Sequence, residues 1–235
     1  MKIPLIRDIG DLENHYRDWL LDEVDLAICR CSTNLGWGDP IHFLRRRAWA
    51  RELVPPRSNL HTAIRHGDVN ALNVLVDEDG LTGSTSRAKG YQRSHTDCFN
   101  RVIDWDTASW VPAPAAIQHP LFIANIPGIR NDDAPQDMDF TEDRAYLENA
   151  IRELCVDGSN VADLLATSRE RQFFELSLRN KRVNEEYIRL RCGRVANSQQ
   201  ILEQELEEFF HKHAGMRDNP ALRVLHTQFA VVHGT

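Results

Sequence analysis

Apolar residues recur at three- and four-residue intervals over residues 11–31, which predicts an amphipathic helix. A second helix is expected after Asp39, because an aspartate that caps, followed by proline at the first helical position, is typical of a helix start. This helix should end before Pro55 and Pro56. The apolar positions that share one face of the first helix are Leu12, Tyr16, Trp19, Leu20, Val24, Ala27 and Ile28.

The C-terminal half is also expected to be helical. A helix should begin at Thr141, where Glu142 and Asp143 follow as acids of the first turn. Its inward positions are predicted to be Tyr146, Leu147, Ala150, Ile151 and Leu154. Further helices are predicted over about 160–179, 183–192 and 198–213. The helices of residues 11–53 are expected to pack against these tail helices, and the proline-rich stretch after Trp110 is expected to wind over the surface.

One short region has strand character instead. The run Val74 to Val76 predicts a short buried strand, and Val102 with Ile103 predicts its return strand. Residues 83–100 between them are polar and aperiodic, which predicts an inserted loop in the hairpin.

Composition restricts the choice of partners. The 235 residues carry a formal net charge of -7, which argues against nucleic-acid binding. No apolar run is long enough to span a bilayer, and the first residues lack the apolar core of a signal peptide. The five cysteines are irregularly spaced, which favours reduced thiols and a cytoplasmic location. No pattern specifies an oligomeric state.

The candidate chemistry lies around the predicted ribbon. Asp68 and Asn73 are five residues apart, the spacing that a kinase catalytic loop uses for its acid and its metal-binding asparagine. Asn73 directly precedes the first strand, and Asp104 ends the second. These three side chains should therefore meet at one end of the ribbon, where oxygen ligands can hold Mg²⁺.

Each residue has a simpler explanation when it is taken alone. Asp68 could be a turn residue, Asn73 a strand cap and Asp104 an exposed strand end; their joint order and spacing favour the kinase-type interpretation. His66 is expected to anchor the loop backbone. For Asp106, a supporting role is favoured over direct metal binding.

The segments HGDVNALNVLVDEDG and RVIDWDTASWVPAP resemble the aminoglycoside phosphotransferase and choline kinase-like families, most closely the fungal phosphotransferase-domain proteins. The resemblance covers residues 4–125 and, more loosely, the tail to about 213. It implies a kinase-like fold in which Asp68 is the catalytic base and Asn73 and Asp104 bind magnesium. It also implies ATP-dependent phosphorylation of a hydroxyl group on a small-molecule substrate.

The expected fold class is therefore α+β, mainly α: a single protein-kinase-like C-lobe over 1–235 with the N-lobe absent. We divide it into a helical subdomain (1–60), the catalytic loop and β ribbon (61–110) and a helical tail (111–235). The sequence has no glycine-rich phosphate loop, and Lys2 is the only lysine ahead of His66. Weak ATP binding and impaired phosphotransfer are therefore expected.

The length of the hairpin connection departs from the family pattern. Asn73 and Asp104 are 31 positions apart, against about a dozen in the family pattern, and residues 83–100 are interpreted as a retained intron. The alternatives are a non-catalytic, pseudokinase-like binding module or an incomplete gene product. A hydrolase built on Asp68 and Asp104 is disfavoured, because the sequence has neither a Gly-x-Ser-x-Gly nor a His-Glu-x-x-His motif.

Overall fold

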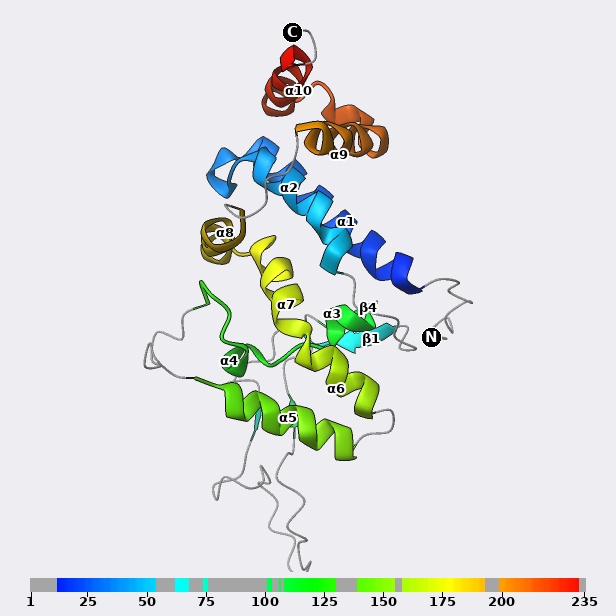
Figure 1. The fold of residues 1–235 in the computed structure, drawn as a ribbon, viewed down its shortest axis with the longest axis vertical. Helices are drawn as coiled ribbons and strands as arrows, with labels where there is room; N and C mark the ends of the chain where they lie inside the picture. The colour runs from blue at the N-terminus through cyan, green and yellow to red at the C-terminus, as the bar shows by residue number, and fades with distance from the viewer. Residues whose placement is uncertain are drawn as a thin grey trace, which may run out of the picture.

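The protein is mainly helical, with two small antiparallel ribbons, and this agrees with the expected α+β class (Figure 1). The computed structural model describes residues 12–53, 62–67, 74–75, 101–102, 106, 108–129, 139–154, 158–192 and 199–232. Within these ranges, no helix is long and apolar enough to cross a membrane.

The first part of the chain contains the helices α1 (Leu12–Thr33), η1 (Leu35–Trp37), α2 (Pro40–Ala50) and η2 (Arg51–Leu53). The strands follow as β1 (Thr62–Arg65), β2 (Val74–Leu75), β3 (Arg101–Val102) and β4 (Ser109–Pro112). The middle helices are α3 (Ala113–Ala116), α4 (Leu121–Ala124), α5 (Thr141–Leu154), α6 (Gly158–Ala166) and α7 (Ser168–Ser177). The last elements are α8 (Lys181–Tyr187), the π-helical turn η5 (Ile188–Cys192), α9 (Gln199–Lys212), η6 (Ala214–Met216) and α10 (Pro220–Val232).

The first two helices form as the sequence predicts. The backbone N–H of Ile41 donates to Oδ1 of Asp39 at 3.0 Å, which satisfies a free N–H at the start of α2. The predicted apolar face of α1 is buried at Tyr16, Leu20, Val24, Ala27 and Ile28. Both helices contact the tail: α9 packs against α2, and α10 packs against α1 and α2. Helix α10 itself was not predicted.

An aromatic cluster around Tyr187 joins α8 to α7 and α2. The Tyr187 ring lies edge-on to Phe173 at a centroid distance of 4.8 Å and to Phe174 at 5.8 Å. Trp49 of α2 lies 5.8 Å from the same ring. Since buried aromatic pairs add to the free energy of apolar burial, this cluster stabilises the centre of the helical part.

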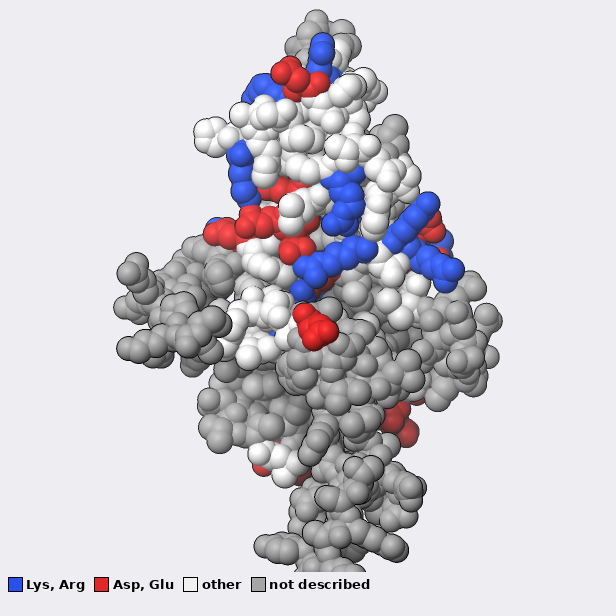
Figure 2. All heavy atoms as spheres, turned by 180° about the vertical axis from the view of Figure 1, so that it is seen from behind, with Lys and Arg blue, Asp and Glu red and all other residues white. Residues whose placement is uncertain are grey.

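Arginines and carboxylates connect α1, α2 and α9 next to this core. Nε of Arg47 donates to Oδ1 of Asp25 at 3.0 Å, and Nη1 of Arg47 also contacts Glu205 and, at 3.1 Å, Glu208. Arg47 and Asp25 are almost fully buried. Figure 2 shows basic and acidic side chains interspersed over the helical part of the face that it presents.

The predicted inward face of α5 is only partly correct: Leu147, Ala150 and Ile151 are half-buried, but the other two predicted residues are exposed. Tyr146 and Leu154 are 77% and 83% exposed, whereas Leu147 is half-buried. The buried residue of α5 is Arg144, whose Nη1 donates to the carbonyl of Ile123 at 2.9 Å. Because this guanidinium satisfies a carbonyl of α4, a polar residue occupies the most buried position of the helix, on the same face as the half-buried Leu147 and Ile151.

The stretch after Trp110 does not wind over the surface as expected. Val111, Ala113, Ala115 and Ala124 are buried, because small side chains let β4, α3 and α4 approach the helices closely. Farther along, the predicted helix over 160–179 is two helices, α6 and α7, which meet at Thr167.

The structure contains two ribbons where one was expected. The predicted ribbon is confirmed: β2 pairs antiparallel with β3, with Val74 opposite Val102. The second ribbon, β1 with β4, was missed in the sequence. Its outer face exposes Ile64 and Trp110, which pair across the two strands.

Candidate functional site

The two ribbons are nested in the chain. β1 ends opposite the start of β4, where Arg65 pairs with Ser109. β2 begins opposite the end of β3, where Val74 pairs with Val102. The connections 66–73 and 103–108 therefore both link one ribbon to the other, and antiparallel pairing holds their flanking residues side by side.

All five residues that the sequence singled out fall on these two connections. His66, Asp68 and Asn73 belong to the first, and Asp104 and Asp106 belong to the second. Asp68, Asn73 and Asp104 lie outside the described residues, as does the predicted insertion 83–100. Their convergence on one cation therefore stays a prediction.

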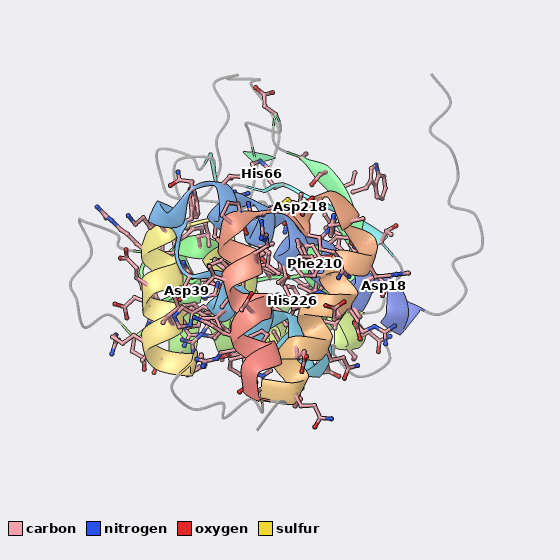
Figure 3. The ribbon with its side chains drawn as sticks, turned by 90° about the horizontal axis from the view of Figure 1, so that it is seen from above. Asp18, Asp39, His66, Phe210, Asp218 and His226 are labelled. Atoms are coloured by element: carbon pink, nitrogen blue, oxygen red, sulfur yellow. The ribbon has the colours of Figure 1, made fainter. Side chains whose placement is uncertain are left out.

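The two other residues are described. His66 follows β1 directly and is 5% exposed, whereas Asp106 is exposed. Figure 3 labels His66 on the side where the strands lie, and Phe210 and His226 on the C-terminal helices α9 and α10. A buried position is compatible with the anchoring role predicted for His66, and the exposure of Asp106 leaves its role open.

A cavity of about 150 Å³ opens beside His66 and Gly67. Its walls come from the end of β1, from residues 116–121 after α3, and from α7 with the turn that follows it. The chain continues from Gly67 directly to Asp68, so the cavity adjoins the start of the predicted catalytic loop. Sequence reasoning missed this site, because its walls are far apart in the chain and share no motif.

Glu175 of α7 is the buried acid of this cavity. The hydroxyl of Tyr16 donates to Oε1 at 3.1 Å, and Nη1 of Arg65 donates to Oε2 at 3.2 Å. Burial raises the pKa of Glu175 to about 7, although Arg65 and the hydrogen bonds lower it in part. The guanidinium of Arg65 also lies 5.6 Å from the ring of Trp19. Glu175 thus ties the last residue of β1 to α7, and its charge changes near neutral pH.

His119 fixes the opposite wall of the cavity. Its Nδ1 lies 3.0 Å from the hydroxyl of Ser168, and its Nε2 lies 3.1 Å from Oε1 of Glu148. Nε2 of Gln172 donates to the carbonyl oxygen of His119 at 2.8 Å. Burial lowers the pKa of His119 against the opposing effect of Glu148. With both ring nitrogens in contact, His119 is better suited to holding the wall than to exchanging protons with a ligand.

Two free thiols that the structure describes lie outside this cavity. Cys29 and Cys31 are free cysteines of α1, and burial raises the pKa of the Cys31 thiol to about 12, which makes it unreactive. Across the part of the chain that the structure describes, no three His, Cys, Asp or Glu side chains are grouped to hold a metal ion.

Comparison with known proteins gives no relative: no family model, no curated protein and no solved structure matches this chain. The structure therefore defines this chain as a mainly α protein with two nested antiparallel ribbons and a cavity at the end of β1.

Proposed function

We propose that this chain is the catalytic-loop lobe of a phosphotransferase of the aminoglycoside-phosphotransferase type, which phosphorylates a hydroxyl of a small molecule with ATP and Mg²⁺. One observation carries the proposal. The motif residues Asp68, Asn73 and Asp104 fall, in the order that the chemistry needs, on the two connections that link the nested ribbons.

The donor set fits magnesium. Carboxylate and amide oxygens are the ligands that Mg²⁺ prefers, and Asn73 and Asp104 are the residues that would hold it. Asn73 is bonded to Val74, and Asp104 follows Val102 by two residues, so the pairing of these valines favours a shared location. Bound Mg-ATP would supply the phosphoryl group and neutralise its charge.

The remaining residues have positioning roles. Asp68 would orient the acceptor hydroxyl and take its proton, and His66 would anchor the loop backbone from its buried position. Asp106 would support the second connection. We also propose that these 235 residues by themselves bind nucleotide weakly, because they contain no glycine-rich phosphate loop.

Metal binding is therefore a better test than turnover. We expect Mn²⁺, used as a paramagnetic substitute for Mg²⁺, to broaden the backbone NMR signals of Gly67, Val74 and Val102. The signal of Phe210 should stay sharp, because α9 lies toward the C-terminal end, away from the ribbons (Figure 1).

Asp104→Asn should weaken this Mn²⁺ binding by about tenfold or more, because it removes one ligand charge. Asp143→Asn, the same substitution on the exposed surface of α5, is the matched control and should retain binding. The proposed site would be refuted if Mn²⁺ broadened the NMR signals of exposed acidic residues in general. It would also be refuted if the signals of Gly67, Val74 and Val102 were broadened equally in Asp104→Asn.

A further inference from the structure

The cavity beside His66 contains buried polar atoms without a hydrogen-bond partner. Gln172 is 3% exposed, and its Oε1 has no partner. Nε of Arg65 and Nε2 of Gln118 are also buried without a partner at hydrogen-bonding geometry, although Gln118 lies close enough to the Glu175 carboxyl to lower its pKa. Leaving such a group unsatisfied costs about 1–3 kcal/mol, so three of them around one cavity indicate that it is filled by something polar.

The free atoms and the charges favour an anion. Two of the three unsatisfied groups, on Arg65 and Gln118, are N–H donors that an anion can accept from. The lining contains two basic residues, Arg65 and Arg179, and one acidic residue, Glu175. Glu23 balances part of the charge of Arg179 from outside the lining, at 2.7 Å. When Glu175 is protonated, the lining has two cations and no anion.

The volume limits the size of the ligand. A cavity of about 150 Å³ holds about five water molecules at roughly 30 Å³ each. It is below the roughly 300–1,000 Å³ that drug-sized ligands need. A single carboxylate or tetrahedral oxyanion fits this space together with a few waters.

We propose that this cavity is a binding site for a small oxyanion, which accepts hydrogen bonds from Arg65 and Gln118. Two further residues complete the site. Oε1 of Gln172 accepts a hydrogen bond from a bound water, and the charge of Arg179 adds to the positive electrostatic potential that attracts the anion. The site goes beyond the phosphotransferase proposal, since it rests on described residues alone. Its position beside Gly67 would place the anion at the entrance of the 66–73 connection.

Glu175 makes this binding dependent on pH. The groups that surround its carboxyl are Tyr16 on α1, Arg65 on β1, Gln118 after α3, Arg171 on α7 and Arg179 just after α7. His66 and His119 also line the cavity. As the pH falls through about 7, Glu175 is neutralised and Arg65 is released to bind the anion. If only this protonated form binds, the affinity rises about tenfold between pH 8 and pH 6.

The experiment is a calorimetric titration of the full chain with sulfate and, separately, with acetate at constant ionic strength. Neither anion titrates between pH 6 and pH 8, so the pH dependence reports on the protein. We expect saturable one-site binding that is about tenfold tighter at pH 6 than at pH 8. Tighter sulfate binding would identify a tetrahedral ligand such as a phosphate, and tighter acetate binding would identify a carboxylate.

Three variants separate this site from general anion attraction. Glu175→Gln should bind at pH 8 as tightly as the wild type binds at pH 6, with no pH dependence. Gln118→Met, which removes a donor and keeps the volume, should weaken binding at both pH values by about fivefold or more. Gln204→Met, the same change on the exposed face of α9, should have no effect.

Absence of saturable binding of either anion by about 50 mM would overturn the proposal. It would also be overturned if Gln118→Met bound as tightly as Gln204→Met. Asp104→Asn removes the proposed metal site but should leave anion affinity unchanged, so the two proposals fail independently of each other.

Discussion

Replacing Glu175 with glutamine converts a buried acid into a neutral group of almost the same shape. Burial raises the pKa of this carboxyl from its ordinary 4.5 to about 7. The folded protein therefore binds the proton more tightly than the unfolded chain does. The favourable contribution of Glu175 to folding is complete below pH 4.5 and is lost as the pH rises to about 7. At 1.36 kcal/mol per pKa unit, the total loss is about 3 kcal/mol.

Glutamine has the hydrogen-bonding pattern of the protonated acid, so Glu175→Gln should escape this loss. We expect urea unfolding to give similar free energies for both proteins at pH 5. Between pH 5 and pH 8, the wild type should lose about 2.5 kcal/mol relative to the variant. Taking the difference between the two proteins at each pH cancels the titration of all other groups.

The control is Glu153→Gln on the exposed surface of α5, which should change the free energy of unfolding by less than about 0.5 kcal/mol at either pH. Parallel pH profiles for the wild type and Glu175→Gln would refute the reasoning. A variant that is less stable than the wild type at pH 8 would also refute it, because the Arg65 ion pair would then outweigh the cost of burying the charge.

Two further substitutions test the packing by urea unfolding. Gly128 has φ +85°, and an added Cβ would lie 2.8 Å from the backbone at the start of α8, so Gly128→Ala should destabilise the protein by about 2 kcal/mol or more. Gly215→Ala, where a Cβ meets nothing within 4 Å, should be nearly neutral. Arg47→Met leaves the buried Asp25 without its main guanidinium partner and should cost about 3 kcal/mol, whereas Arg189→Met on the exposed side of η5 should cost less than about 0.5 kcal/mol.

The parts of the fold that the sequence predicted correctly are those set by local periodicity. In α1, residues such as Leu20 and Val24 repeat at helical spacing. Both are fully buried in the structure, so the periodic pattern and the burial agree. The pairing of β2 with β3 followed from two short β-branched runs, Val74 to Val76 and Val102 with Ile103.

The parts that were missed depend on contacts between distant residues. β1 and β4 are four residues each, and their pairing brings together positions more than 40 residues apart with no turn signal between them. In α5, the periodic pattern placed Leu147 and Ile151 correctly on the partly buried face, but it did not reveal that Arg144 is buried there because it binds a carbonyl of α4. The candidate site shows the same limit: Glu175 appears in the sequence only as an ordinary acid of a helix, and its pKa depends on Tyr16 and Arg65, 159 and 110 positions away.

Arg65 connects the two candidate sites physically. It is the last residue of β1, so the 66–73 connection with its HGD motif begins directly after it. Its guanidinium is held by Glu175 from α7 and lies against Trp19 of α1. A bound oxyanion would compete with Glu175 for this guanidinium, and protonation of Glu175 would favour the anion. Anion binding and protonation of Glu175 both act on Arg65, which directly precedes the 66–73 connection. We therefore expect that cavity occupancy and pH influence the candidate catalytic loop through the ion pair between Arg65 and Glu175.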